Sequence, residues 1–262
     1  MEYIGIDIGS TCAKVAVLDE DENILHQSVQ PTGWSSVDTA EIIKNMLLEK
    51  GICPETGKVV ATGYGRVSVP YADKTVTEIT CHARGAVWLH KKKDMTVIDI
   101  GGQDIKAISI DENGAVKNFL MNDKCAAGTG RFLEMMARTL GLSLEEMSTK
   151  GLEWKENVVI SSMCTVFAES EVVSLVAQNK NVADIIHGLN VSVASKVGAL
   201  AARLGKNNPG EYMMTGGVAK NKGITNALEE KLGAKLYICD EAQLCGALGA
   251  ALFAYEKCKK GE

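Results

Sequence analysis

The sequence is poor in proline, has no stripe of basic residues and contains no hydrophobic run long enough to cross a membrane. Its 262 residues include four prolines against 26 glycines, which is typical of a turn-rich α/β protein. A net charge of −5 argues against nucleic acid as a partner. The longest apolar stretch, near residues 246–255, covers about half of a membrane span.

The start of the chain has no basic region and no cleavage signal, so we expect a cytoplasmic protein. In that compartment its eight cysteines are expected to be free thiols or metal ligands and not disulfides. An apolar content of 46% is ample for a buried core, in one large domain or in two small ones.

The chain contains an internal repeat. Residues 6–19 read IDIGSTCAKVAVLD and residues 98–111 read IDIGGQDIKAISID, 92 positions later and without a gap. Such a repeat at a fixed offset indicates a duplicated structural unit. The offset superposes Asp7 on Asp99, Gly9 on Gly101, Lys14 on Lys106 and Asp19 on Asp111.

Each copy of the repeat predicts a β-hairpin that can bind phosphate. β-Branched residues run into Asp-x-Gly, two small or polar residues follow, and a second alternating run begins. The glycine lets the backbone approach a ligand, and successive N–H groups of such a turn form an anion cradle. An acid that enters the turn can hold the Mg²⁺ that accompanies a phosphate. Two such hairpins predict ATP with Mg²⁺ as the ligand, although each alone is also compatible with a simple tight turn.

The two turns differ where chemistry would require it. The first offers hydroxyl and N–H groups, and the second carries Gln103, which is suited to orienting an attacking water. Asp104 is expected either to accept the proton of that water or to fix the water shell of the metal. One of the two repeat lysines is expected to reach a phosphate, and the other to pair with a surface acid. The expected nucleotide-binding residues are Asp7, Gly9, Ser10, Thr11, Lys14, Gly101 and Gly102, and the expected catalytic residues are Asp99, Gln103 and Asp104.

A third glycine turn lies at residues 214–219, where a predicted strand runs into a predicted helix. The pair Gly216 and Gly217 would let an adenosine or its α-phosphate lie against bare backbone, or would serve only as a structural turn. Two phosphate hairpins followed by such a pair resemble the sugar kinase, heat-shock protein and actin superfamily. The resemblance implies an α/β fold of two duplicated ribonuclease-H-like lobes, with a nucleotide cleft between them. The expected lobes are residues 1–94 and 95–262, and a final helix at 243–262 can pack back on the first lobe.

Hydrophobic periodicity predicts most other elements. The helix that begins at Ser36 is expected to have that residue as its N-cap. Helices are predicted over residues 36–50, 78–90, 130–140, 168–178, 184–204 and 244–255, and strands over residues 23–30, 58–62 and 211–214.

Two cysteines lie in distinctive segments. Cys125 stands in NDKCAAGTGRF (122–132) and Cys164 in SSMCTVFAESE (161–171), each before a predicted helix. The free N–H groups of a helix start stabilise a thiolate and suit the sulfurs of an iron–sulfur cluster. A [4Fe–4S] cluster needs four cysteines, which a two-fold homodimer would supply. Buried thiols, a zinc site and a redox pair are the alternatives.

These segments, with ATGYGR (61–66) and MTGGVAKN (214–221), resemble the activator, or archerase, component of 2-hydroxyacyl-CoA dehydratases. The wider family also includes the ATPase subunits of benzoyl-CoA reductase, and the resemblance covers essentially the whole chain. It implies a homodimeric, oxygen-sensitive ATPase in which Cys125 and Cys164 of each protomer hold one bridging [4Fe–4S] cluster. Reduced ferredoxin or flavodoxin would supply an electron, which passes to a partner dehydratase.

Two rival functions remain open at this point. One is a small-molecule kinase of the same superfamily, and the other is a non-catalytic nucleotide switch. Only an activator is expected to be brown. The segment Tyr64-Gly65-Arg66 is expected to act in lobe closure or partner contact. The remaining cysteines are expected to have packing or surface roles: Cys12, Cys53, Cys81, Cys239, Cys245 and Cys258.

Overall fold

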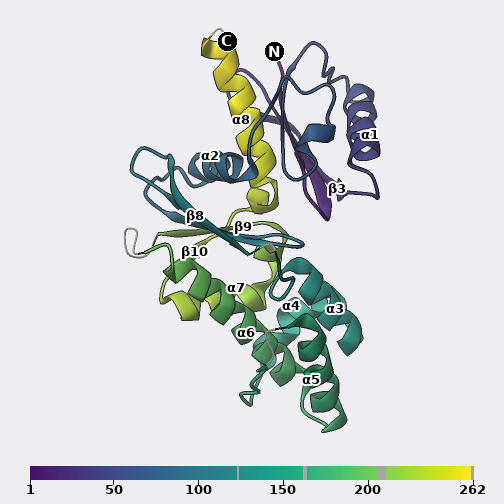
Figure 1. Ribbon diagram of the computed structural model, residues 1–262, viewed down its shortest axis with the longest axis vertical. Helices are drawn as coiled ribbons and strands as arrows, with labels where there is room; N and C mark the ends of the chain where they lie inside the picture. Colours follow the sequence, from purple (N-terminus) through teal and green to yellow (C-terminus); the bar gives the residue numbers. More distant parts are fainter. Residues whose placement is uncertain (123, 162–163, 206–210, 261–262) are drawn as a thin grey trace. The chain divides into compact units, whose positions relative to one another are not determined.

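The computed structural model of the chain describes residues 1–122, 124–161, 164–205 and 211–260 (Figure 1). The chain divides into two compact units. The first contains Met1–Lys93, Ile110–Lys117 and the residues from Cys239 onward, and the second contains Asp94–Ser109 and Asn118–Ile238.

The first unit is built on a five-stranded mixed sheet with the order β3-β2-β1-β4-β5. β1, β2 and β3 are antiparallel, and β4 and β5 continue the sheet in parallel with β1. The strands are β1 (Tyr3–Ile8), β2 (Cys12–Leu18), β3 (Ile24–Pro31), β4 (Lys58–Thr62) and β5 (Lys74–Thr75). The helices are α1 (Ser36–Glu49), α2 (Glu78–His90) and α8 (Cys245–Lys260), with short 3₁₀ turns η1 (Arg66–Ser68) and η4 (Asp240–Leu244).

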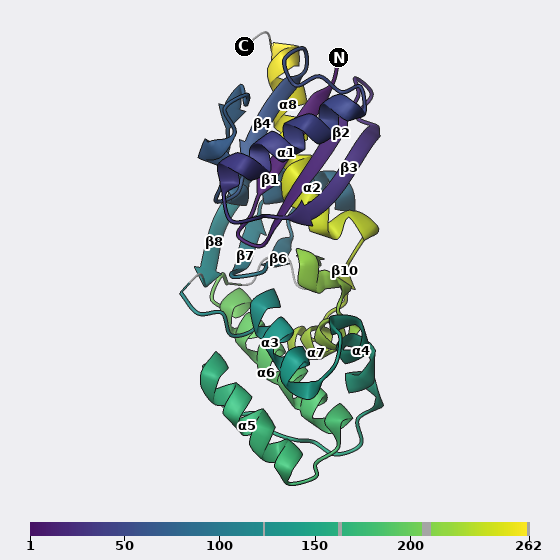
Figure 2. The ribbon, with the colours of Figure 1, turned by 90° about the vertical axis from the view of Figure 1, so that its right-hand side faces the viewer.

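Helices cover both faces of this sheet, because alternate residues of a strand point to opposite sides. Ile6 and Val15 belong to one hydrophobic cluster with Ile43 of α1. Leu18 belongs to a second cluster with Leu248 of α8. Figure 2 shows α1 over one face of the sheet and α8 over the other.

The second unit repeats the sheet and adds more helices. Its strands follow the order β10-β9-β6-β7-β8. They are β6 (Thr96–Ile100), β7 (Ile105–Ile110), β8 (Val116–Asn122), β9 (Tyr212–Thr215) and β10 (Leu236–Tyr237). The helices are α3 (Gly130–Leu140), α4 (Leu144–Lys150), α5 (Thr165–Ala177), α6 (Val182–Ala202) and α7 (Lys222–Leu232), with 3₁₀ turns η2 (Gly151–Glu153) and η3 (Gly217–Lys220).

The expectation that no segment is long and apolar enough to cross a membrane is wrong by length and composition, because α6 meets both criteria, as one helix among the described residues. Its most apolar window has a mean hydropathy of 1.3, and 56% of that window is buried inside the protein. Leu189, Val193 and Val197 lie in the core of the unit. The apolar character of α6 is therefore that of a core helix.

The duplication extends to individual hydrogen bonds. Gly9 N–H donates to Cys12 O at 3.1 Å, and 92 residues later Gly101 N–H donates to Asp104 O at 3.0 Å.

At the next turn of each copy, the carboxylate of Asp19 or Asp111 accepts two backbone N–H groups. The pKa of Asp19 is lowered mainly by the side-chain amide of Asn23, which donates at 3.0 Å, and also by the backbone bonds. The pKa of Asp111 is lowered mainly by the backbone N–H of Ala115.

Three local expectations are corrected. The N-cap of α1 is Ser35, whose hydroxyl accepts from Asp38 N–H, and not Ser36. α4 was not expected, although Ser143-x-x-Glu146 forms a capping box at its start. The helix expected over 168–178 begins at Thr165, so Cys164 is its N-cap residue.

Candidate functional site

The first hairpin places a carboxylate and an ammonium group at the end of two buried strands. Asp7 is the penultimate residue of β1 and is buried, and Lys14 Nζ lies 3.2 Å from Asp7 Oδ2. The turn residues Gly9, Ser10 and Thr11 are half-buried. The Thr11 hydroxyl is buried and has no hydrogen-bond partner among the described residues. The turn thus combines backbone N–H groups, a hydroxyl and a lysine, which are donors that suit phosphate.

The second hairpin repeats this pair and adds another acid. Lys106 Nζ lies 3.3 Å from Asp99 Oδ2 and 2.7 Å from Asp104 Oδ1, and all three side chains are buried. The expectation that one repeat lysine pairs with a surface acid is therefore wrong, because both lysines pair with buried carboxylates. Gln103 at the tip of the turn is exposed and accessible to a ligand.

The third glycine turn packs directly against the second hairpin. Gly216 has φ +85°, and a Cβ at this position would overlap the carbonyl oxygen of Ile100. Thr215 Oγ1 donates to Asp99 Oδ1 at 2.9 Å. Gly217 begins η3, so the glycine pair leaves bare backbone at the carboxyl end of β9. Only a residue without a side chain fits between this turn and β6.

The first unit contains the same arrangement, which sequence reasoning missed. Gly63 has φ +84° and follows Thr62 at the end of β4, and a Cβ there would overlap Ile8 O and Asp7 Oδ1. Thr62 pairs with Asp7 in the sheet register as Thr215 pairs with Asp99. The Thr62 hydroxyl is buried and has no hydrogen-bond partner among the described residues. The dipeptide Thr-Gly occurs at both places, as Thr62-Gly63 and Thr215-Gly216, and could have indicated the correspondence. The two dipeptides are not separated by the 92 residues of the hairpin repeat, so the repeat alone does not align them.

α3 starts on the second phosphate turn. Gly130 N–H donates to Gly101 O at 2.9 Å, and Arg131 N–H donates to Gly102 O at 2.9 Å. The first N–H groups of a helix have no partner within the helix, so these carbonyls satisfy two of them. The loop that carries Cys125 joins β8 to this helix start, with Gly128 at φ +88°. The turn and the cysteine loop therefore form one hydrogen-bonded structure.

Each motif cysteine precedes a helix: Cys125 lies in the loop before α3, and Cys164 is the N-cap residue of α5. α3 and α5 pack together, and Thr139 Oγ1 near the end of α3 donates to Glu169 Oε1 near the start of α5 at 3.0 Å. Cys164 is exposed at the start of α5, and Cys125 is half-buried. Asp123, Ser162 and Met163 of the two motifs lie outside the described residues.

The described residues of one chain hold no group of three or more His, Cys, Asp or Glu arranged for a metal ion. Two thiols at helix starts are half of the donor set of a [4Fe–4S] cluster, so a second copy would be needed to complete it. Beside Cys164 the first turn of α5 exposes Val166 and Phe167, which are 64% and 67% accessible. Cys81 and Cys245 differ from this pair because they are fully buried, and burial raises the pKa of Cys81 to about 12. Cys12, Cys53, Cys239 and Cys258 are half-buried, as Cys125 is.

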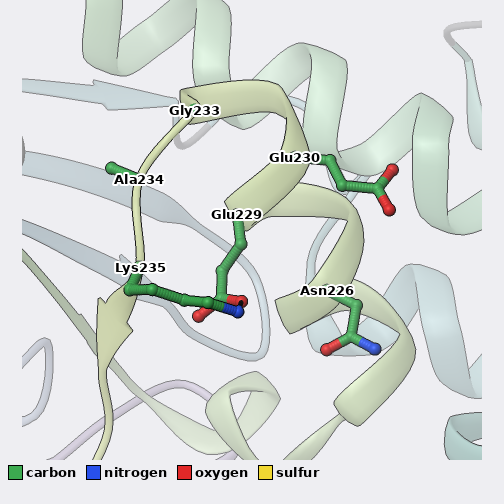
Figure 3. Close-up of a pocket in the computed structure, with 6 residues that line it drawn as sticks. All are labelled: Asn226, Glu229, Glu230, Gly233, Ala234 and Lys235. Atoms are coloured by element: carbon green, nitrogen blue, oxygen red, sulfur yellow. Dashed lines mark hydrogen bonds and ion pairs between the residues drawn. The ribbon is translucent and has the colours of Figure 1, made fainter.

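A separate pocket of about 510 Å³ lies at the end of α7 (Figure 3). Its lining residues are Asn226, Glu229, Glu230, Gly233, Ala234 and Lys235. Glu229 is already held there by Lys235 Nζ at 2.6 Å and by Leu236 N–H at 3.0 Å. None of the hairpin or cysteine-loop residues lines it, so we assign it no part in the nucleotide site.

Comparison with known proteins identifies the family. Residues 4–254 match the model of the BadF/BadG/BcrA/BcrD ATPase family. The chain belongs to this family. Its match covers nearly the whole chain and includes both hairpins, both cysteine segments and the third glycine turn. The family resemblance expected from the motifs is thereby confirmed, as is the expectation of an ATP-hydrolysing enzyme.

Relatives within this family are similar over their whole length. The chain is 41% identical to the 2-hydroxyisocaproyl-CoA dehydratase activator of Clostridioides difficile, covering 100% of this chain and 98% of that one. It is 45% identical to the (R)-2-hydroxyglutaryl-CoA dehydratase activating ATPase of Acidaminococcus fermentans, covering 98% of both. A benzoyl-CoA reductase subunit of Thauera aromatica is 32% identical, with 97% and 94% covered.

Solved structures of such relatives have the same fold. The C. difficile activator with bound ADPNP superposes with a TM-score of 0.91 at 41% identity, covering 100% of this chain and 97% of that one. The (R)-2-hydroxyglutaryl-CoA dehydratase component from A. fermentans gives a TM-score of 0.92 at 45% identity, covering 99% of both chains. A ROK-family glucokinase from Streptomyces griseus has a TM-score of 0.63 at 16% identity, with 98% and 100% covered, which shows the fold alone. The predicted fold class, α/β with duplicated halves of the actin and sugar-kinase type, is confirmed.

Proposed function

We propose that this family member is the ATP-hydrolysing activator of a 2-hydroxyacyl-CoA dehydratase and donates one electron to it through a [4Fe–4S] cluster. The observation that carries the proposal is the hydrogen bonding of α3 to the second phosphate turn, through Gly130 and Arg131. It joins a nucleotide-binding element to a cysteine loop in a chain 41–45% identical to dehydratase activators.

The nucleotide roles follow from the hairpin geometry. Asp7 and Asp99 would hold Mg²⁺, and Gln103 would orient the attacking water. Of the two roles expected for Asp104, its ion pair with Lys106 favours fixing the water shell of the metal, because the ammonium group already occupies Asp104 Oδ1 at 2.7 Å. The relative that binds ADPNP supports a nucleotide at this site. Adenosine would lie against Gly216 and Gly217. The phosphates would be contacted by Gly9, Ser10, Thr11, Lys14, Gly101 and Gly102.

The cluster would be held by Cys125 and Cys164 from each of two copies of the chain. The donor set fits, since two thiols per chain supply four in a two-fold dimer, and the N–H groups at the start of α5 favour a charged sulfur at Cys164, its N-cap residue. When bound, the cluster supplies one-electron transfer at low potential. Cys164 is exposed and Val166 and Phe167 beside it are unburied, as a surface that meets a second copy requires.

Coupling between the two sites would run through the second unit. A change in the turn at Gly101 and Gly102 on ATP hydrolysis would move the start of α3, because both carbonyls accept its first N–H groups. The Cys125 loop is continuous with that helix start. Nucleotide state would then change the surroundings of the cluster, which is the mechanical link an activator needs.

The partners in this proposal are a second copy of the chain, a 2-hydroxyacyl-CoA dehydratase, and reduced ferredoxin or flavodoxin as electron source. We retain a cytoplasmic location, since all eight cysteines, which lie among the described residues, are free thiols. The alternatives are an activating ATPase of a benzoyl-CoA-type reductase, supported by the 32% identical relative from T. aromatica, and a small-molecule kinase of the same fold.

The deciding experiment measures iron, acid-labile sulfide and the visible spectrum of anaerobically purified protein. We expect about four iron per dimer and a broad band near 400 nm. Both should be lost in Cys125→Ala, Cys164→Ala and retained in the matched control Cys239→Ala, Cys258→Ala. A colourless dimer that stays free of iron after anaerobic reconstitution, yet hydrolyses ATP or transfers phosphate, would exclude the redox function and favour the kinase.

A further inference from the structure

Lys196 of α6 reaches into the cysteine loop. Its Nζ donates to Ala127 O at 2.7 Å and lies 3.5 Å from Cys125 Sγ. The side-chain stem passes the loop, since a Cβ on Gly128 would lie 3.8 Å from Lys196 Cδ. Lys196 is half-buried, and Ala127 is buried. The ammonium group is therefore fixed between a carbonyl oxygen and a sulfur.

This lysine is exceptional on its helix. It is the one lysine or arginine of α6, and its neighbours Val193 and Val197 lie in the core. A half-buried lysine loses rotamer freedom and hydration, which costs free energy unless specific bonds offset it. Here the bonds go to one carbonyl and to one sulfur of the proposed cluster.

We propose that Lys196 is a positioning residue for the cluster, which anchors the Cys125 loop and places a positive charge beside that sulfur. This inference rests on the proposed function. The cluster, held by Cys125 and Cys164 of two copies, would accept one electron from reduced ferredoxin or flavodoxin. The ammonium group of Lys196 would be attracted more strongly to the sulfur after that electron is added, so Lys196 would raise the reduction potential.

The anchoring contact lies close to the nucleotide turn. Ala127 O is bound to α6 through Lys196, and three residues later Gly130 N–H is bound to Gly101 O. The stretch between the two bonds includes Gly128 at φ +88°. Lys196 therefore holds the cysteine end of the segment whose other end is held by the phosphate turn.

The test uses the reconstituted dimer and compares Lys196→Met, Lys196→Gln and Lys196→Arg with wild type. A potentiometric titration followed by electron paramagnetic resonance gives the reduction potential. We expect the equilibrium constant for one-electron reduction to fall about tenfold in Lys196→Met and Lys196→Gln, about 59 mV. Lys196→Arg should stay near wild type because it keeps the charge and the donors. The control Lys180→Met removes an exposed lysine that pairs with Glu156 at 3.4 Å, and should have no effect.

Hydrogen exchange of the full-length, metal-free chain tests the anchor without the cluster. Amides 126–130 should exchange faster in Lys196→Met than in wild type or Lys180→Met. Loss of iron from Lys196→Met with retention in Lys196→Arg would also support the anchor. Wild-type potential, iron content and exchange in both Lys196→Met and Lys196→Gln would overturn the inference. A wild-type protein that binds no iron would instead overturn the proposed function, and unchanged exchange in Lys196→Met would then reject the anchor independently.

Discussion

Gly130 donates its amide N–H to the carbonyl oxygen of Gly101 at 2.9 Å, so α3 begins on the phosphate turn of the second hairpin. There is also little room for a side chain at this position, since a Cβ on Gly130 would lie 3.3 Å from Gly102 Cα. Glycine at position 130 therefore allows the close approach of the helix to the turn. The contact makes α3 the element through which the turn can act on the cysteine loop.

Gly130→Ala tests this contact. Replacing glycine by alanine in a helix usually stabilises it by about 0.5–1 kcal/mol, so a loss points to the contact and not to helix propensity. We expect weaker MgATP binding by calorimetry, about threefold to tenfold, because the new methyl pushes α3 off the turn. The control Gly33→Ala meets no atom within 4 Å and should bind MgATP like wild type. Equal affinity in both variants would mean that the turn does not need α3.

Thr215→Val removes the hydroxyl that donates to the buried carboxylate of Asp99. We expect the free energy of unfolding in urea to fall by about 1–2 kcal/mol, since a buried acceptor loses a donor. Thr62→Val is the matched control in the other unit, because the Thr62 hydroxyl occupies the equivalent register position but donates to no carboxylate among the described residues. That variant should lose less stability than Thr215→Val, since no buried charged acceptor loses a donor. A similar loss in the free energy of unfolding in Thr215→Val and Thr62→Val would contradict a specific role for the hydrogen bond from Thr215 to Asp99.

Lys106→Met removes the cation from between two buried carboxylates. We expect a loss of about 3–5 kcal/mol in the free energy of unfolding, as for breaking a buried ion pair. Adding Asp104→Asn should recover part of the loss, because one uncompensated charge disappears. Lys14→Met removes a more exposed lysine that pairs with Asp7 at 3.2 Å, so it should affect MgATP affinity more than stability. The prediction fails if Lys106→Met unfolds in urea like wild type.

The cysteines of the metal-free protein should react with iodoacetamide at different rates. Burial raises the pKa of Cys81 to about 12, so at pH 8 about one thiol in 10⁴ is ionised, and the protonated form persists throughout pH 7–9. Cys164 is exposed and should be modified at least about a hundredfold faster, as followed by mass spectrometry of peptides. In urea the two rates should converge. Comparable rates in the folded protein would show that Cys81 is accessible.

Much of the fold follows from the sequence because the repeat and the periodicity are strong local signals. The limits of β4, α2 and α3 agree with their predicted ranges, and strand pairing in both hairpins follows the Asp-x-Gly pattern. α4 was missed because it is a short helix with few buried side chains, and its only strong signal is the capping box. β5 and β10 were missed because strands of two residues carry no periodicity.

The site was less predictable, since it depends on contacts between distant residues. The spacing of Lys106 from its acids is visible in the sequence, but its burial between both depends on packing over the strands. Gly63 was not recognised as the counterpart of Gly216, because the segments inserted before β9 break the 92-residue offset. Lys196 carries no motif at all, and only the packing of α6 brings it to Cys125.

The two hairpins are copies of one backbone design that differ by a unit of charge. The first, residues 3–18, has one acid and one base, and the second, residues 96–110, has two acids and one base. We therefore expect the second copy to attract a divalent cation more strongly than the first, and the first copy to repel a phosphate less than the second. In this interpretation the duplication gives two similar turns, and the additional carboxylate of Asp104 makes the second more favourable for a cation and less favourable for an anion.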